Sequence, residues 1–228
     1  MKTVLSWSSG KDSAWTLHTL REQGVHMSLL LTTVNETFGR VAMHGVRREL
    51  LEAQAEAVGI PLMVVDLPWP CSNEVYEAKM RAATDQLVAD GYDTIAFGDL
   101  FLRDIRTYRE KQLEHVALEP IFPLWEIPTD ALAHQMIDGG LKARITCIDP
   151  SKLTSDFAGR EWDKSLLDEL PSGVDPCGEN GEFHTFVYEG PMFTRPIGIR
   201  MEETVERDGF IYSDILPAGV VEKELIML

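Results

Sequence analysis

Short apolar segments alternate with longer amphipathic ones through the first half of this chain, and this alternation restricts the fold more than any other feature. Buried strands are predicted at residues 4–7, 27–34, 62–67, 94–97 and 120–124, with helices at 13–23, 49–58, 72–91 and 105–116 between them. Repeated strand–helix–strand units make right-handed crossovers and place helices on both faces of a parallel sheet. The first half is therefore predicted to be α/β: a doubly wound, five-stranded, mainly parallel Rossmann-like sheet.

The sequence pattern changes after Trp125. One more helix is predicted at residues 128–139 and one more strand at 143–148, followed by a segment rich in Gly, Pro and Asp. Residues 197–226 predict strands joined by turns, with a hairpin signal at Asp208-Gly209. We therefore expect two domains, residues 1–125 and a smaller α+β domain at 126–228.

Charge and cysteine content restrict the partners. The 228 residues include 21 basic and 37 acidic side chains, a net charge of -16 that would repel a phosphate backbone and argues against nucleic acid. Cys71, Cys147 and Cys177 are far apart and form no CxxC pair, which is typical of reduced thiols in a cytoplasmic protein. No apolar segment approaches the ~20 residues that cross a membrane.

A hydroxyl-rich loop, Ser8-Ser9-Gly10-Lys11-Asp12-Ser13, follows the first predicted strand. Ligands of doubly wound sheets bind at the carboxyl ends of strands, and backbone N–H groups at a helix N-terminus bind phosphate. The Rossmann and Walker patterns are both absent from this loop. The alternative is a plain connection in which Ser8 caps the helix and Lys11 is solvated.

The loop resembles the S-G-G-K-D-S pyrophosphate loop of the adenine-nucleotide α-hydrolase superfamily, the N-type ATP pyrophosphatases. The resemblance implies cleavage of ATP between its α and β phosphates. Ser9 stands where that loop usually has glycine, and we expect Ser9 to keep a negative φ.

Three further blocks are similar to the diphthine–ammonia ligase family. They are "MHGVRRELLEAQAEAVGIPL", "FGDL" followed by "PIFPLW", and "GENGEFHTFV". Together with the first loop they cover most of the chain in the order of the family. The family's Tyr-Gln-Arg run is replaced by Asp104-Ile105-Arg106. The resemblance thus implies use of ATP and leaves the acceptor open.

The resemblance also implies where the nucleotide binds. Nucleotide contacts are expected from Ser8, Ser9, Gly10, Lys11, Asp12, Ser13, Thr32, Thr33, His44, Gly98 and Asp99. Thr32 and Thr33 would lie at the adenine, and His44 would reach the phosphates. Lys11 and Asp12 are expected to be catalytic, with Lys11 stabilising the departing pyrophosphate. Asp12 would orient the loop or share a Mg²⁺ ion.

Two glutamates of the last block, Glu179 and Glu182, are the remaining catalytic candidates. They would hold the metal, bind ammonia or act as a base on ammonium, and the alternative is a solvated turn. Arg106, Gly181 and Thr185 are expected to bind substrate, with a solvated helix face as the alternative for Arg106. His184 is expected to face solvent on a strand, with a catalytic role as the alternative, and Cys177 is expected to be a structural thiol.

The predicted function is that of an ATP-dependent amide ligase that adenylates a carboxylate, releases pyrophosphate and transfers ammonia. ATP and Mg²⁺ are the expected cofactors, the acceptor bears a carboxylate, and a homodimer is expected. Two alternatives are a related enzyme that transfers sulfur to RNA and a regulatory module that binds adenine nucleotide without turnover. Acidity and scattered thiols argue against the first, and Lys11, Asp12, Glu179 and Glu182 together argue against the second.

Overall fold

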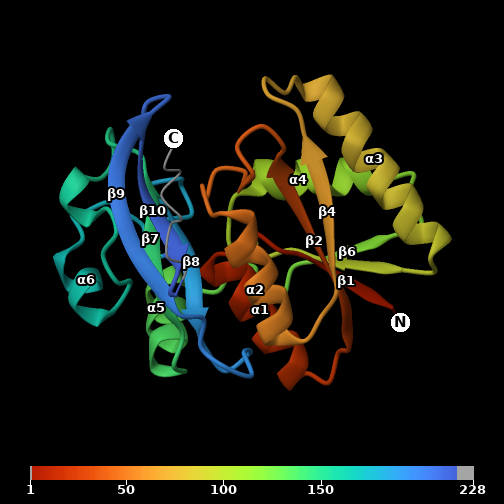
Figure 1. Cartoon of the computed structure of the whole chain (residues 1–228). Coiled ribbons are helices and arrows are strands. Elements are labelled where there is room, and N and C mark those ends of the chain that lie inside the picture. Colours follow the sequence, from red (N-terminus) through yellow and green to blue (C-terminus); the bar gives the residue numbers. More distant parts are fainter. Residues whose placement is uncertain (1, 220–228) are drawn as a thin grey trace.

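A mainly parallel sheet forms the first half of the computed structural model, which describes residues 2–219 (Figure 1). Its central strand is β1 (Thr3–Ser6), flanked in parallel by β2 (Met27–Asn35) and β5 (Thr94–Ala96). β4 (Leu62–Leu67) lies outside β2, and β6 (Glu119–Ile121) lies outside β5. The strand order therefore reverses between β1 and β5, and a ligand site is expected at the carboxyl ends of these two strands. The predicted doubly wound α/β sheet is confirmed.

The sheet has a sixth strand that the sequence did not indicate. β3 (Arg40–Val41) pairs antiparallel with Val34 and Asn35 at the end of β2. Val34 also pairs with Asp66 of β4, so β3 lies on the β1 side of β2, beyond the end of β1. The five predicted parallel strands are thus joined by one antiparallel strand, and a two-residue strand is too short to have a periodicity. The chain that follows β3 passes over the carboxyl end of β1.

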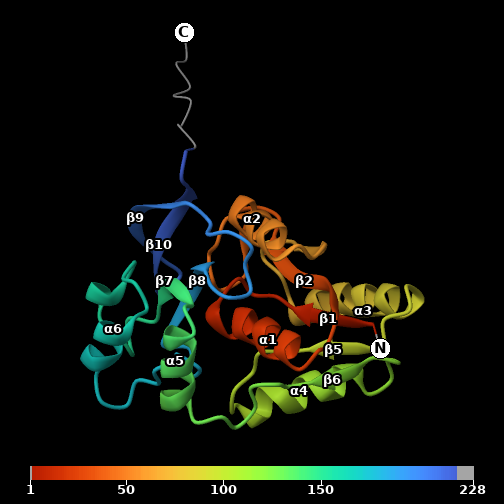
Figure 2. The same ribbon diagram turned by 90° about the horizontal axis from the view of Figure 1, so that it is seen from below.

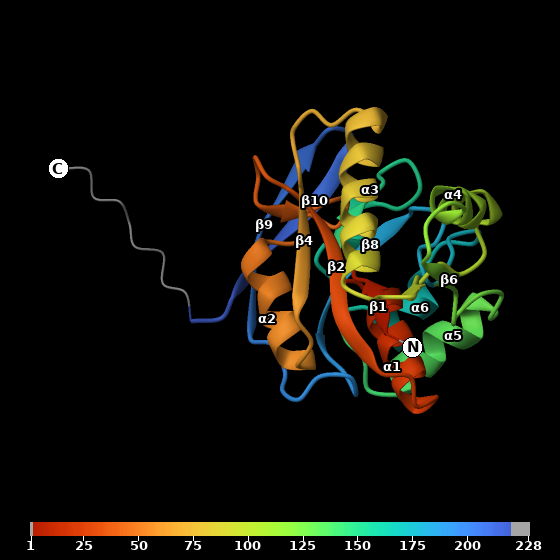
Figure 3. The same ribbon diagram turned by 90° about the vertical axis from the view of Figure 1, so that its right-hand side faces the viewer.

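Helices cover both faces of this sheet. Apolar side chains of α1 (Lys11–Glu22) and α2 (Arg48–Val58) pack with Leu5 and Leu30 on one face. Those of α3 (Asn73–Ala89) and α4 (Arg103–Leu113) pack with Val4 and Leu31 on the other. Figure 3 shows α2 and α3 on opposite sides of β2 and β4. Neighbouring residues of each strand thus enter different cores, as they do in any sheet that is buried on both faces.

The second half folds around an antiparallel sheet in the order β8-β7-β10-β9. Its strands are β7 (Lys142–Ile148), β8 (Phe183–Glu189), β9 (Ile199–Arg207) and β10 (Phe210–Pro217). Three helical segments accompany them: α5 (Thr129–Asp138), the 3-10 turn η1 (Ser155–Phe157) and α6 (Lys164–Glu169). The hairpin turn at Asp208-Gly209 is confirmed, with φ of 51° and 81°, and residues 220–226 of the expected strand segment lie outside the described residues.

The two sheets share part of their hydrophobic core. Buried side chains of β1 and α1, such as Leu5 and Leu17, belong to the same cluster as Ile145 of β7 and Phe186 of β8. Figure 2 shows α1 between the two sheets, and α1 contacts β8 directly. The division at Trp125 stays a prediction. No helix among the described residues is long and apolar enough to cross a membrane.

Candidate active site

Two neighbouring cavities open at the carboxyl ends of β1 and β5. The larger, about 430 Å³, lies on the α3 and α4 side of the sheet, and the smaller, about 220 Å³, lies at the N-terminus of α1. Six residues line both: Ser6, Ser8, His44, Phe97, Arg109 and His184. The two cavities therefore share a wall, at the switch point that the strand order predicts.

The Ser-rich loop reaches the smaller cavity with its amides already paired to hydroxyl groups. The Ser8 N–H donates to Ser13 Oγ at 3.3 Å, and the Gly10 N–H donates to Ser8 Oγ at 3.3 Å. The Lys11 N–H, at the start of α1, donates to Thr185 Oγ1 of β8 at 3.1 Å. A phosphate oxygen that bound here would replace a hydroxyl oxygen as the acceptor, so the expected anion site is compatible with the structure.

Lys11 and Asp12 form an ion pair at the floor of the smaller cavity. Lys11 Nζ lies 3.0 and 2.8 Å from the two Asp12 carboxylate oxygens, and only 3% of the Lys11 side chain is exposed. Burial alone would lower the pKa of Lys11, but the charges of Asp12 and Glu179 offset it and the pKa is raised. Burial raises the pKa of Asp12 despite Lys11. Lys11 is thus held as a cation inside the cavity.

Ser9 departs from the expected backbone conformation. Its φ is +72°, where a negative value was expected, and its hydroxyl is buried without a hydrogen-bond partner among the described residues. The left-handed conformation is imposed by the backbone around it: the Ser9 carbonyl accepts from Gln54 Nε2 at 3.0 Å and from the Val187 N–H at 3.1 Å. The loop therefore keeps a glycine-like backbone at a residue that is not glycine.

A buried glutamine connects the two sheets behind this loop. Gln54 of α2 has no exposed surface, accepts from Trp7 Nε1 at 2.9 Å and donates to the carbonyls of Ser9 and Val187. All three contacts use the side-chain amide, so one residue fixes β1, the loop and β8 relative to one another. The sequence block that contains Gln54 did indicate a family feature, but not this bridging role.

Two glycines permit close approaches at the site. A Cβ on Gly10 would lie 2.7 Å from His44 Cε1, and a Cβ on Gly98 would lie 2.9 Å from the Asp12 carbonyl carbon. Both distances are shorter than real Cβ contacts, so any side chain would push these segments apart. Gly10 and Gly98 therefore support the site by leaving room for its other residues.

Glu179 enters the smaller cavity from the second sheet. Its Oε1 accepts from the Leu100 N–H at 2.8 Å, and it lines the same cavity as Lys11 and Asp12. Burial, with the charge of Asp12, raises the pKa of Glu179 to about 7. A carboxylate that titrates near neutral pH can exchange a proton with a reacting group.

Glu182 does not reach either cavity. It is 3% exposed, and its Oε1 accepts from the Asp175 N–H at 3.0 Å and from Asn180 Nδ2 at 3.1 Å. Its Oε2 is buried without a partner among the described residues. Glu182 and the neighbouring Gly181 are absent from both cavity linings. Glu182 thus contacts its own loop, and of the two glutamates Glu179 is the one that lines a cavity.

His44 and His184 form a pair in the wall between the cavities. Their ring centroids are 4.8 Å apart, and His44 Nδ1 lies 3.0 Å from the Thr185 carbonyl oxygen. Burial lowers the pKa of His44 to about 4 and that of His184 to about 3, with help from Lys11, so both rings are neutral at pH 7. His184 is half-buried rather than fully solvated, because His44 of the loop after β3 packs against its ring.

The other predicted residues fall into three groups. Thr32 and Thr33 line the larger cavity, where Thr32 Oγ1 donates to the Trp7 carbonyl at 2.7 Å. Asp99 lines the smaller one and pairs with Arg109. Arg106 lines neither cavity: it pairs with Glu110 at 2.8 Å, and its guanidinium lies over Phe122 and Trp125.

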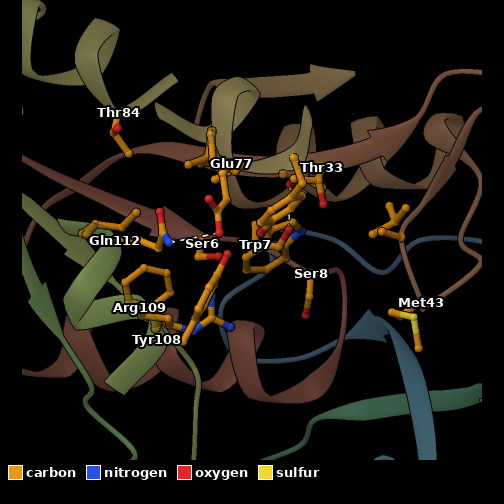
Figure 4. A pocket seen from close by; sticks show the side chains of 18 of the residues that line it. Ser6, Trp7, Ser8, Thr33, Met43, Glu77, Thr84, Tyr108, Arg109 and Gln112 are labelled. Atoms are coloured by element: carbon orange, nitrogen blue, oxygen red, sulfur yellow. Dashed lines mark hydrogen bonds between the residues drawn. The ribbon is translucent and has the colours of Figure 1, made fainter. Parts of the chain in front are cut away.

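The far end of the larger cavity was not predicted. Figure 4 shows Glu77 and Thr84 entering it from α3, with Tyr108 and Gln112 entering from α4. Gln112 Nε2 donates to Glu77 Oε1 at 3.3 Å. Helical spacing predicts that such side chains share a face, but it does not indicate that the face borders a cavity.

A magnesium site was expected at Asp12. Among residues 2–219 no group of three or more His, Cys, Asp and Glu side chains is arranged to hold a metal. Mg²⁺ usually takes one or two carboxylates and completes its coordination with phosphate oxygens and water. Asp12, a carboxylate in a cavity that also fits phosphate, is compatible with such a site.

Comparison with known proteins gives related matches for both halves. A family model described as the diphthamide synthase N-terminal domain matches residues 1–120, and one described as the C-terminal domain matches residues 128–215. A diphthine–ammonia ligase of Danio rerio is 25% identical over 90% of this chain and 89% of its own length. One of Schizosaccharomyces pombe is 24% identical over 90% of this chain, which spans 37% of that relative.

A solved structure also aligns with the chain. It is described as a predicted subunit of tRNA methyltransferase from Methanocaldococcus jannaschii, and it is 18% identical with a TM-score of 0.44, covering 86% of this chain and all of that one. The family assignment does not depend on this alignment, because the two family models cover most of the sequence in the expected order. The chain belongs to the diphthamide synthase family.

Proposed function

We propose that this protein uses ATP to activate a carboxylate and then forms an amide with ammonia, releasing AMP and pyrophosphate. One observation carries the proposal: the smaller cavity is lined by Lys11 and Asp12 of α1 and by Glu179 of the loop that precedes β8. A fixed cation, a loop that fits phosphate and a carboxylate of pKa about 7 are the groups that such a reaction needs.

In the first step, the acceptor carboxylate attacks the α-phosphorus of ATP. The bond from that phosphorus to the oxygen that bridges the α and β phosphates breaks, and its electron pair leaves with pyrophosphate. Lys11 lies at the α1 N-terminus, where its charge and the helix dipole both stabilise the departing anion. The adenosine would occupy the larger cavity beside Thr32 and Thr33.

In the second step, the nitrogen lone pair of ammonia attacks the acyl carbon, and the bond to AMP breaks. The nitrogen must lose a proton for the amide to form. Glu179 is placed to accept it, because its raised pKa leaves it basic at neutral pH and hydrogen bonding to Leu100 fixes its carboxylate.

Magnesium would be held by Asp12 together with phosphate oxygens, and it would neutralise charge on the pyrophosphate. Glu182 would act indirectly, by shaping the loop that presents Glu179. Thr185 would act through its hydroxyl at the Lys11 N–H rather than by binding acceptor.

The two alternatives have less support. Sulfur transfer needs a thiolate, but burial raises the pKa of both Cys147 and Cys177. A regulatory module without turnover would have no use for a carboxylate of pKa about 7 beside Lys11. The relatives are named for diphthine and ammonia, and here we extend ammonia and a carboxylate acceptor to this chain. We also propose a cytoplasmic location, because free thiols are typical of cytoplasmic proteins. The proposed oligomeric state is a homodimer.

The test is a product assay. The protein is incubated with ATP, Mg²⁺, ammonium and a cell extract fractionated into small molecules and proteins. We expect equal amounts of AMP and pyrophosphate, released only with the fraction that contains the acceptor. Formation of ADP would contradict the ligase, and ATP binding without turnover in any fraction would favour the regulatory module.

A further inference from the structure

Arg109 of α4 lies where the two cavities meet. It is one of six residues that line both, and its side chain is 31% exposed. Figure 4 shows it entering the larger cavity from α4 beside Tyr108. Arg106, the cation of this helix that was expected to bind substrate, pairs with Glu110 and lines neither cavity.

Arg109 is anchored to the end of β5 on two sides. Its Nε lies 2.7 Å from Asp99 Oδ2, and its guanidinium carbon lies 4.5 Å from the centre of the Phe97 ring. The first contact is an ion pair without hydrogen-bond geometry, and the second is made by the guanidinium carbon over the ring. Among residues 2–219 neither terminal nitrogen of Arg109 makes a hydrogen bond, and the closest approach of the ion pair is through Nε. A fixed guanidinium with two available donors is suited to bind an oxyanion.

The charges around the shared wall leave this role to Arg109. Lys11 lies in the smaller cavity and is paired with Asp12, while His44 and His184 in the wall are neutral at pH 7. The larger cavity fits adenosine and the smaller fits pyrophosphate under the proposed function. The phosphate that joins these two parts must therefore cross the shared wall.

We propose that Arg109 binds the α-phosphoryl group of the adenine nucleotide, and that Asp99 is a positioning residue that orients its guanidinium. This inference rests on the proposed function. Arg109 would neutralise the group that accepts the acyl oxygen, while Lys11 neutralises the group that leaves. The two cations would thus act on opposite sides of the bond that breaks.

The experiment is calorimetric titration of AMP, adenosine and pyrophosphate into the full chain. We expect Arg109→Gln to weaken AMP binding at least tenfold and to change adenosine and pyrophosphate binding less than twofold. Arg109→Lys keeps the charge but loses the planar fork, so it should fall between the two. Arg106→Gln, on the same helix and outside the cavities, is the matched control and should bind all three as the wild type does.

One further variant tests whether weaker AMP binding has another cause. Arg109→Gln leaves Asp99 unpaired, and its charge alone could repel AMP. The double variant Asp99→Asn/Arg109→Gln removes both charges. We expect it to bind AMP as weakly as Arg109→Gln does, and recovery of wild-type affinity would overturn the inference.

The remaining outcomes separate the inference from the proposed function. If Arg109→Gln binds AMP like the wild type, or loses adenosine or pyrophosphate equally, the α-phosphoryl role is wrong and the ligase proposal stands. If the wild type binds neither ATP nor AMP, both fail. Thermal unfolding checks that each variant folds. If Arg109→Gln does not fold, AMP binding by Arg109→Lys tests the inference instead.

Discussion

Two loops from different sheets face each other across the smaller cavity, and they present their charges in opposite ways. Residues 8–13 place Lys11 and Asp12 side by side as an ion pair at a helix N-terminus. Residues 178–185 separate their two glutamates: Glu179 enters the cavity, and Glu182 turns back into its own loop. The two charges of the first loop thus lie together in the cavity, whereas the two glutamates of the second loop have different surroundings.

This contrast follows from local geometry. Lys11 and Asp12 begin a helix, so the same helix N-terminus places both at the cavity. Glu179 and Glu182 lie in a turn-rich segment that precedes β8, where Gly178 and Gly181 have positive φ. Backbone reversals of this kind send nearby side chains in different directions. Spacing along the sequence therefore predicts shared chemistry in a helix better than in a turn.

The largest expected effect is in the first loop. Lys11→Met should reduce the rate of pyrophosphate release by about 10³-fold, because it removes the cation that stabilises the leaving group. The measurement is AMP and pyrophosphate release under conditions in which the wild type turns over.

A second variant guards this result against misfolding. Lys11→Met alone leaves Asp12, whose side chain is 26% exposed, without its partner, which costs about 1–2 kcal/mol of folding free energy after allowance for solvent screening. The double variant Lys11→Met/Asp12→Asn removes both charges and should fold better while staying inactive. Wild-type turnover in either variant would exclude Lys11 from the chemistry.

A smaller loss of activity is expected in the second loop, with a distinct pH signature. Glu179→Gln keeps the acceptor for the Leu100 N–H but removes the base, so kcat should fall about 10²-fold. The wild-type rate should rise as pH passes through about 7, where Glu179 loses its proton, and the variant should lack this rise. An unchanged profile between pH 6 and 8 would assign the base to another group.

Ionisation of Glu179, which should increase the rate, should decrease the stability of the fold. The folded pKa of Glu179, about 7, lies above its usual value near 4.5, so folding costs free energy once the pH rises above 4.5. Glu179→Gln should remove this cost and stabilise the fold above pH 7, by about 1–2 kcal/mol after allowance for solvent screening. Below pH 4.5 the variant and the wild type should be equally stable.

Glu182 should show the converse behaviour. Glu182→Ala leaves the Asp175 N–H and Asn180 without their acceptor in a buried loop, so the free energy of unfolding should fall by about 2–3 kcal/mol. Its kcat should change less than about threefold, since the side chain lines neither cavity. Urea unfolding and turnover of the same preparation measure both. A large loss of kcat with unchanged stability would return Glu182 to the catalytic group.

Most of the first sheet could be predicted because its signals are local. The covering helices are long enough to show their periodicity, and the alternation with these helices indicates even the three-residue strands β5 and β6. The loop at residues 8–13 lies at the end of a strand whose place this alternation fixes. β3 has two residues, and β8 emerges from a segment rich in Gly and Pro, so their presence depends on pairing with distant strands.

The site was predicted less completely, for reasons of tertiary contact. The alternation along β8 correctly predicts that Phe183 and His184 point to opposite faces of the strand, with Phe183 in the core. It does not predict that the chain after β3 covers the other face, where His44 contacts His184. Arg106 and Arg109 lie three residues apart on α4, slightly less than one helical turn, so the helical period alone places them on nearly the same side. Only the position of the β5 end decides that Arg109 reaches the cavities.

The smallest expected effect concerns the backbone of the first loop. Ser9 holds φ at +72° with its hydroxyl buried and unpartnered among the described residues, so Ser9→Gly should relieve both costs. Glycine loses more entropy on folding, which leaves a net stabilisation of about 1 kcal/mol. Ser9→Ala removes only the hydroxyl and is the matched control, which should gain less than glycine in urea unfolding. If alanine and glycine gave equal gains, backbone strain at Ser9 would be excluded, and the loop would hold its left-handed conformation at no cost.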